Sequence, residues 1–183
     1  MADSKPADLE ARVRELEDVR EINDAFFHWH YECTGGFNGK QAGREGALDV
    51  LTDDAMIDAH PAGRGKGPRG REQCKQFWDF FYGDNGPLPY VFQTSVAERV
   101  RIKGDTAVQE SNMLGMFQNR GGKPRIGLSQ RINEFVRTPK GWKIRYTNIE
   151  GGFAAFADKF EGNLNKLPEQ EPRTLPVFDN QKP

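Results

Sequence analysis

The stretch Val-Arg-Ile-Lys-Gly-Asp-Thr-Ala, residues 100–107, lies at the centre of the pattern that decides the fold. Its Gly104-Asp105 pair is a turn signal, and on both sides of it apolar and polar residues alternate in the manner of strands. Two further alternating runs follow, with turn signals at Gly121-Gly122 and Pro139-Lys140-Gly141. Three consecutive hairpins predict a four-stranded antiparallel meander. Its expected strands are residues 91–103, 106–118, 125–137 and 142–149.

A long amphipathic helix is expected upstream, at residues 7–33. Apolar residues recur there in steps of three and four, and Gly35-Gly36 ends the pattern. At 100° per residue they cover an arc of roughly 200°, and we expect this arc to be buried. Asn23 and His30 fall inside the arc, so they line either a pocket or a buried polar network. The apolar positions are Leu9, Val13, Leu16, Val19, Ile22, Phe26, Trp29 and Cys33.

Shorter elements complete the expected architecture. A short helix at residues 44–51, a strand at 55–60 and a second helix at 71–82 lead into the meander. After the meander, a short helix is expected to carry Phe153, Phe156 and Phe160, followed by a Pro-rich extension. Helices, one short strand, another helix and then a meander make an α+β plan.

The composition limits the classes of protein to consider. A chain of 183 residues suits one domain with a sizeable core. Its formal net charge of -1 gives no general attraction to nucleic acid or to an anionic membrane. There is no apolar run of about 20 residues, as a membrane span needs, and residues 1–21 lack the apolar core of a signal peptide. Cys33 and Cys74 cannot make a disulfide framework, so we expect a soluble cytoplasmic protein.

Several local motifs, taken in their order, resemble the nuclear transport factor 2-like superfamily and, within it, the SnoaL-like domain. They are Leu51-Thr52-Asp53-Asp54-Ala55, Gly70-Arg71-Glu72 before Phe77, residues 100–107, Phe135-Val136-Arg137-Thr138 and Gly141-Trp142-Lys143-Ile144. The resemblance covers about residues 9–150 and implies a cone-shaped, curved antiparallel sheet wrapped around the N-terminal helix. It divides the chain into a SnoaL-like domain at 1–150 and a tail at 151–183 that packs on the domain or on a partner subunit. Polyketide cyclases, scytalone dehydratase and ketosteroid isomerase are members of this superfamily.

Asp58 and His60 are candidate catalytic residues because they lie two positions apart in the short strand. Side chains at i and i+2 of a strand point to one face, which would place a carboxylate beside an imidazole that titrates near neutrality. Asp58 would orient His60, and His60 would act as general base or acid. The alternative is a surface histidine beside an unrelated aspartate. The resemblance to ketosteroid isomerase favours the pair, since Pro61-Ala62-Gly63 matches its Pro-x-Gly and His60 holds the place of its catalytic acid.

The end of the first helix carries further candidates. Tyr31-Glu32 resembles the Tyr-Asp pair of scytalone dehydratase, which implies that Tyr31 polarises a substrate oxygen and that Glu32 lines the cavity. His30 is either a pocket residue, where it would stabilise a developing oxyanion or a leaving group as a catalytic residue, or a satisfied core histidine. Phe27 aligns with the first-helix Tyr of the isomerase, and Gln93 stands where the superfamily often has His. The other expected substrate-binding residues are the aromatic Trp29 and Trp78 and the meander amides Asn112 and Asn148.

No metal, nucleotide or other cofactor is expected. His28 and His30 lie about 200° apart on a helix, so they cannot share an ion. A triad of His30, His60 and Asp58 would depend on the tertiary structure. Gly65-x-Gly67-x-x-Gly70 spells a dinucleotide fingerprint, but no βαβ unit follows it.

The resemblance and the candidate residues together predict a cofactor-independent lyase or isomerase. Its expected substrate is a small hydrophobic or aromatic molecule with hydroxyl or carbonyl groups, such as a polyketide-like or lignin-derived compound. Elimination of water and retro-aldol cleavage both need a base and an oxyanion donor, so the sequence does not separate them. A homodimer is expected, with a trimer as the alternative. The rival from another class is a non-catalytic binding or assembly module of the same fold.

Overall fold

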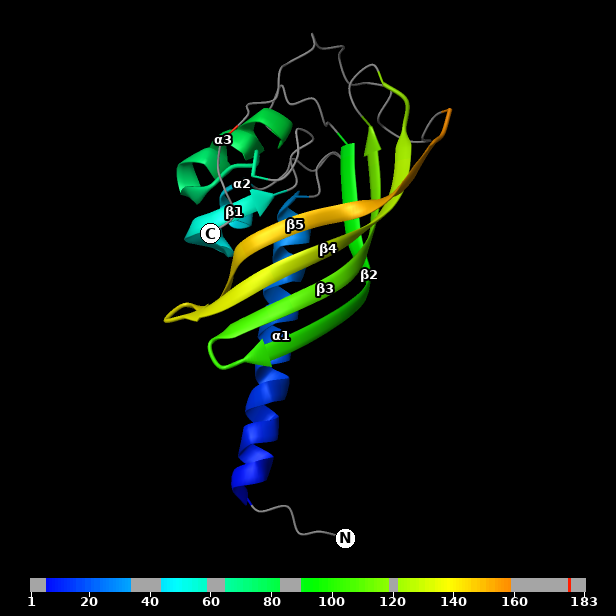
Figure 1. The fold of residues 1–183 in the computed structure, drawn as a ribbon. Helices are drawn as coiled ribbons and strands as arrows, with labels where there is room; N and C mark the ends of the chain where they lie inside the picture. The colour runs from blue at the N-terminus through cyan, green and yellow to red at the C-terminus, as the bar shows by residue number, and fades with distance from the viewer. Residues whose placement is uncertain are drawn as a thin grey trace.

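The computed structural model describes residues 6–33, 44–58, 65–82, 90–118, 122–158 and 178. Its fold is α+β: a curved, open five-stranded sheet with the long N-terminal helix along its concave side (Figure 1). This confirms the expected fold class. The elements are α1 (Pro6–Cys33), α2 (Arg44–Asp49), β1 (Leu51–Asp58), α3 (Gly70–Tyr82), β2 (Tyr90–Lys103), β3 (Thr106–Gln118), β4 (Arg125–Thr138) and β5 (Gly141–Phe156).

The sheet has the strand order β1-β5-β4-β3-β2. Strands β2 to β5 form the predicted meander, with Lys103 paired to Thr106 at the first hairpin and Thr138 to Gly141 at the last. Strand β1 joins the free edge of β5 in parallel, a pairing that the sequence pattern did not predict. The parallel contact brings Asp58 beside Asn148.

The prediction of a helix after the meander is wrong for the residues that the structure describes. Strand β5 continues to Phe156, with Phe153 paired to Leu128 and Phe156 to Arg125 of β4. The spacing of the phenylalanines imitates a helical face. Here the long β4 strand offers a row of backbone donors and acceptors, and pairing with it overrides the local preference. Phe160 lies outside the described residues.

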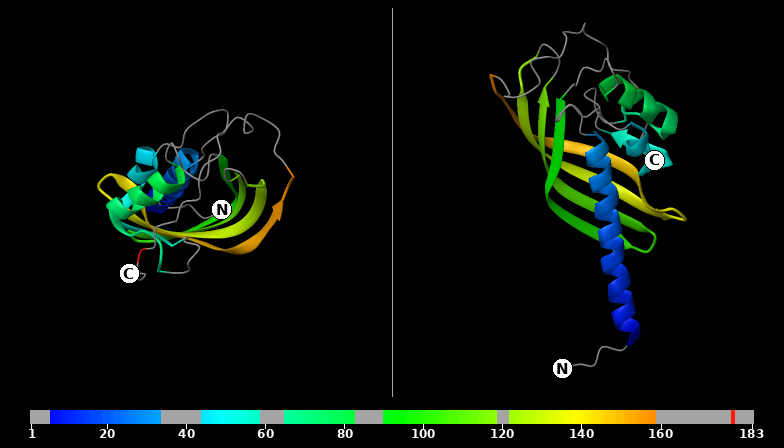
Figure 2. Two further views of the ribbon diagram at one scale, coloured as in Figure 1. Left: turned by 90° about the horizontal axis from the view of Figure 1, so that it is seen from above. Right: turned by 180° about the vertical axis from the view of Figure 1, so that it is seen from behind.

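The core lies between α1, α3 and the concave face of the sheet. Ile22, Phe26 and Trp29 face it from α1, and Trp78 packs edge-on against Trp29 with ring centroids 5.9 Å apart. We also expected the apolar residues in the first half of α1 to be buried, and this prediction is wrong. Leu9, Val13 and Leu16 are exposed because the N-terminal half of α1 projects beyond the edge of the sheet (Figures 1 and 2).

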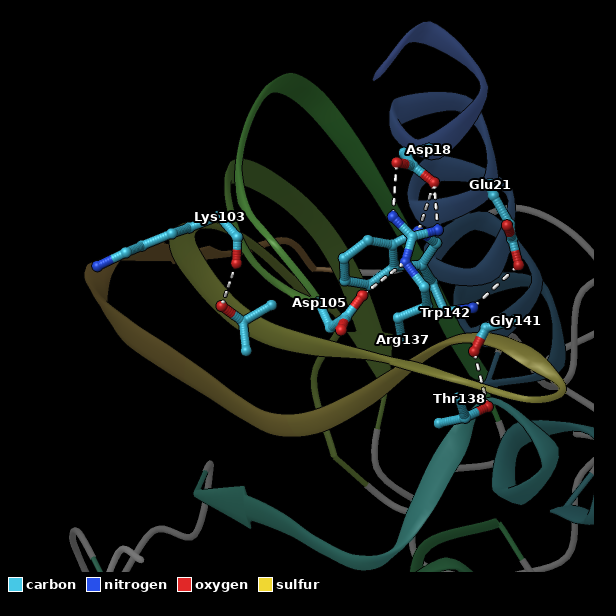
Figure 3. A network of polar contacts seen from close by, with 9 residues as sticks. Asp18, Glu21, Lys103, Asp105, Arg137, Thr138, Gly141 and Trp142 are labelled. Carbon is cyan, nitrogen blue, oxygen red and sulfur yellow. Dashed lines mark hydrogen bonds and ion pairs between the residues drawn. The ribbon is translucent and has the colours of Figure 1, made fainter. Parts of the chain in front are cut away.

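A polar network fixes α1 to the meander where the helix first meets the sheet (Figure 3). Arg137 of β4 donates to both carboxylate oxygens of Asp18, at 2.6 Å each, and the indole nitrogen of Trp142 donates to the same carboxylate at 3.0 Å. Arg137 also stacks on the Trp142 ring and donates to Asp105 at 3.1 Å. The hydrogen bonds from Arg137 hold the pKa of Asp18 below its ordinary value, although burial opposes this shift.

The last hairpin turn is shaped for the same helix. Gly141 has a φ of 93°, a left-handed conformation that favours glycine. The backbone N–H of Trp142 donates to the Glu21 carboxylate of α1 at 2.9 Å. A Cβ atom on Gly141 would collide with that carboxylate. Glycine is therefore required at this turn both for its backbone angle and for the close approach of α1.

Candidate functional site

A chain of buried polar side chains crosses the concave face of the sheet, starting from α1. Gln109 donates to Asn23 at 2.9 Å, and Asn133 donates to Gln109 at 2.8 Å. Thr147 then donates to Asn133 at 2.6 Å, and Arg131 donates to Thr147 at 3.1 Å. Because buried amides and hydroxyls are costly unless hydrogen-bonded, this chain fixes the rotamers of its members. Of the two alternatives expected for Asn23, a pocket or a buried polar network, the structure shows the polar network.

The chain ends at Arg131, whose guanidinium is almost completely buried at 2% exposure. Besides Thr147, this group contacts the side-chain oxygen of Gln93 and the sulfur of Met113, both at 3.4 Å. Its central carbon lies 4.4 Å from the centre of the Trp29 ring, a cation–π distance. With His30, these residues form what we call the Arg131 cluster. A fixed positive charge in a dry site acts more strongly than it would in water.

Arg131 was missed as a candidate by sequence reasoning. A signal for it does exist, since Arg131, Asn133 and Phe135 alternate on one face of β4 and Phe135 is a core residue. The cluster does bring together three predicted residues, His30, Trp29 and Gln93.

His30 is buried against the edge of the Phe26 ring, with centroids 4.3 Å apart. Burial lowers its pKa to about 3, the Arg131 charge adds to this shift, and a backbone hydrogen bond with Gln93 opposes it. The imidazole therefore stays neutral near pH 7. It can exchange hydrogen bonds there, but it is a weak proton acceptor.

A cavity of about 400 Å³ lies on the concave face, next to the Arg131 cluster. Glycines hollow it out: Gly115 pairs with Gly127, and Gly127 pairs with Ala154, so a row of small residues crosses three strands. Met113 lines the cavity and also contacts Arg131, which joins the two features. The other lining residues are Phe117, Arg125, Leu128, Ser129, Ile149, Glu150, Gly151, Gly152 and Phe153.

Two buried polar atoms, one in the Arg131 cluster and one next to it, have no hydrogen-bond partner among the described residues. They are the indole nitrogen of Trp29 and the hydroxyl of Ser95, which pairs with Met113 across β2 and β3. Unsatisfied polar atoms in a folded core are uncommon and mark places where water or a ligand can bind.

Asp58 lies on the other side of the sheet from Arg131. Its carboxylate accepts a hydrogen bond from the backbone N–H of Gly65 at 2.7 Å and one from the Tyr146 hydroxyl at 2.9 Å. Tyr146 is the neighbour of Thr147 in β5, and neighbouring strand residues point to opposite faces. Asp58 therefore ties the loop after β1 to the outer face of β5. His60 lies outside the described residues, so its pairing with Asp58 stays a prediction.

The structure does not bring the remaining candidates together. Phe27 and Tyr31 are exposed on α1, stacked with centroids 6.3 Å apart, and Glu32 beside them is half-buried. Asn112 pairs with Gln130 and lines a second hollow of about 360 Å³ on the outer face. Asn148 donates to Glu150 at 3.1 Å. Trp78 belongs to the core.

Among the described residues, no group of three or more His, Cys, Asp and Glu side chains is placed to hold a metal ion. No helix in the described part of the chain is long and apolar enough to cross a membrane.

Comparison with protein families gives a match to the SnoaL-like domain over residues 14–148. A search of proteins with curated functions finds no match.

Solved structures with the same fold have low sequence identity to the chain. An NTF2-like protein with a cystatin-like fold from Novosphingobium aromaticivorans is 19% identical, covers 81% of this chain and 90% of its own, and has a TM-score of 0.62. A scytalone dehydratase-like protein from the same species is 13% identical over 91% and 99% of the two chains, with a TM-score of 0.60. A hexachlorocyclohexane dehydrochlorinase from Novosphingobium barchaimii is 12% identical over 83% and 99%, with a TM-score of 0.67. These similarities show the fold, which is the one that the resemblance to the nuclear transport factor 2-like superfamily implied.

Proposed function

Because the chain belongs to the SnoaL-like domain family, we propose that it is a cofactor-independent lyase or isomerase for a small aromatic molecule that carries hydroxyl or carbonyl groups. Elimination of water or retro-aldol cleavage is the favoured reaction. Two of its structural neighbours are named for eliminations, a dehydrochlorinase and a scytalone dehydratase-like protein. Substrate and reaction are the parts that we propose.

The observation that carries the proposal is the cavity on the concave face beside a buried guanidinium. Apolar side chains such as Met113, Phe117 and Ile149 line it, which suits an aromatic ring. When a base removes a proton next to a carbonyl, negative charge develops on the oxygen. A charge fixed in advance stabilises that state without rearranging, and Arg131 supplies such a charge.

The residues have different proposed roles. His60 is the proposed base, because an imidazole, whose ordinary pKa lies near neutrality, suits that step. Asp58 has no part in it, since its carboxylate bonds to Gly65 and Tyr146 on the outer face of the sheet. His30 is neutral, so its role is to donate a hydrogen bond to the substrate oxygen or leaving group. Among the described residues, the Ser95 hydroxyl and the Trp29 indole nitrogen are buried without a hydrogen-bond partner, so they could also bind a polar group of the substrate.

The test is turnover of a panel of aryl β-hydroxy ketones and aryl-propane diols, followed by ultraviolet absorbance of the conjugated product and by chromatography. His60→Ala should lower turnover by at least about a hundredfold. Arg131→Gln should lower kcat by about a hundredfold to a thousandfold with a smaller change in substrate affinity. Arg99→Gln, on the outer face, is the matched control and should leave kcat unchanged.

The rival proposal is a binding module of the same fold. If the wild-type protein binds these compounds, as Trp29 fluorescence would report, but converts none, the module is supported and the enzyme rejected. If His60→Ala keeps full turnover, His60 is not the base. Thermal unfolding of Arg131→Gln is measured in parallel, because a kcat loss counts only for a folded variant.

A further inference from the structure

The exposed face of α1 carries apolar side chains in both halves of the helix. They are Leu9, Val13, Leu16, Phe27 and Tyr31, and each is 44–70% exposed. At 100° per residue they lie about 150° around the helix from the stripe of Ile22, Phe26 and Trp29 that packs on the sheet. Together they form what we call the outer stripe. Exposed apolar side chains gathered on one face of a helix are typical of an interaction site.

The projecting half of α1 makes this surface more unusual. Every residue from position 8 to position 17 is exposed, and Asp18 is the first buried one. Figures 1 and 2 show this half extending past the sheet from both sides. A helical segment of this length has little stability by itself in water. A surface that covers the outer stripe would stabilise it.

Two opposite charges divide the outer stripe in its middle. Arg20 and Asp24 lie on the same face, with a nitrogen and an oxygen 3.7 Å apart and side chains that are 84% and 71% exposed. Apolar residues therefore lie on both sides of a charged centre: Leu9, Val13 and Leu16 before it, Phe27 and Tyr31 after it. When a second copy of the helix is placed antiparallel to the first, the apolar residues of one half face those of the other half, and the charges at the centre face opposite charges.

We infer that the outer stripe binds a second copy of this chain through an antiparallel α1–α1 contact. With the two-fold axis at the level of Ile22, Arg20 lies opposite Asp24 of the second copy, and Asp24 opposite its Arg20. Val13 then lies opposite Tyr31 of the second copy, and Leu16 within one residue of its Phe27. The projecting half of each helix rests on the exposed C-terminal half of the other, as an isologous two-fold interface requires.

Charge selects this orientation over the parallel one. In a parallel, in-register pair Arg20 would face Arg20 of the second copy and Asp24 would face its Asp24. Like charges in contact repel each other and are a common means of excluding a wrong pairing. The antiparallel contact is therefore the one that the exposed residues favour.

Charge reversal at the centre tests the inference. The molecular mass of the full chain in solution is measured by sedimentation equilibrium over a wide concentration range. Asp24→Arg places four positive charges at the contact and Arg20→Asp places four negative charges, so each variant should halve the mass that the wild type reaches. A one-to-one mixture of the two variants should restore that mass, because every facing pair is again of opposite charge.

Controls separate this contact from other modes of assembly. Glu15→Arg reverses an exposed charge off the outer stripe and should keep the wild-type mass. Circular dichroism should show both central variants folded, since their side chains are exposed in the single chain. Leu16→Cys should not form a disulfide with itself under mild oxidation, whereas Val13→Cys mixed with Tyr31→Cys should give a crossed dimer. A monomeric wild type, single variants that keep its mass, or a Leu16→Cys dimer would each overturn the inference.

Discussion

Replacing Asp18 by asparagine is expected to destabilise the protein by about 2 kcal/mol at pH 7. The amide keeps one oxygen, which can still accept from Trp142 and from one nitrogen of Arg137. Its nitrogen, however, is a donor, and it would face the second guanidinium nitrogen that now bonds to the carboxylate at 2.6 Å. One hydrogen bond between charged groups is thus lost, worth about 1.5–3 kcal/mol. Because the Arg137 side chain is 35% exposed, water compensates in part and the lower half of that range applies.

The assay is urea and thermal unfolding of the wild type and Asp18→Asn side by side. For a chain of this size about 2 kcal/mol corresponds to a fall in Tm of roughly 4–8 °C. Asp105→Asn is the matched control. Its carboxylate accepts from the same Arg137 but is 84% exposed, so its loss should cost no more than about 0.5 kcal/mol.

The Asp18–Arg137 pair also predicts how stability depends on pH, including the direction of the change. The pKa of Asp18 is lowered in the folded state by its hydrogen bonds to Arg137, so its contribution to stability is present above the unfolded pKa of about 3.9. That contribution is lost as the pH falls through the lower, folded value. The difference between wild type and Asp18→Asn should therefore be full at neutral pH and shrink below about pH 4. Equal stability at pH 7, or a difference that acid leaves unchanged, would refute this account of the network.

Three further outcomes follow from the geometry. Gly141→Ala should destabilise the protein by about 2–3 kcal/mol, because residue 141 has a positive φ and the added Cβ would collide with Glu21, whereas Gly104→Ala should cost only about 1 kcal/mol, because residue 104 has a positive φ but open space around it. Equal costs in urea unfolding would contradict the role of Glu21. Burial and the Arg131 charge hold the pKa of His30 at about 3, so NMR should show no titration of its imidazole between about pH 5 and 8, and titration near pH 6.5 would disprove this. The same lowered pKa should make the wild type lose stability as the pH falls below about 6.5, and His30→Gln should lack this loss. Cys74, whose pKa burial raises to about 12, should react with a thiol reagent at least about a hundredfold more slowly in native Cys33→Ser protein than in urea, and similar rates in both would show the thiol to be accessible.

Local patterns in the chain were enough for most of the fold. The Gly104-Asp105 and Gly141 turns placed two hairpins correctly, because turn geometry fixes which residues face each other across a hairpin. The pattern gave the wrong structure at residues 153–156, where the spacing of phenylalanines is helical but the edge of β4 was available for pairing. It also gave one buried arc on α1 where the structure has a buried stripe and an exposed one. Helical periodicity reports which residues share a face, but not how far a neighbouring sheet extends along the helix.

The candidate site depended more on tertiary structure. Sequence reasoning selected His30, Trp29 and Gln93, and the structure brings these three together around Arg131, which it had not selected. It also assigned Asp58 to a cavity role, while the described structure shows its carboxylate bonded to Gly65 and Tyr146 on the outer face. The inner or outer position of a strand residue follows from register, and β1 takes its register from a parallel pairing with β5 across almost ninety intervening residues.

By itself, therefore, the sequence determined the meander and the order and type of the elements up to residue 149, since these depend on short-range alternation, turns and helical spacing. The resemblance of its local motifs indicated the SnoaL-like family. Only the tertiary structure decided which side of the sheet each polar residue occupies, that a buried arginine lies beside the cavity, and that half of α1 lies clear of the sheet. Those features depend on long-range register and on where one element ends against another, and no local pattern of residues encodes either.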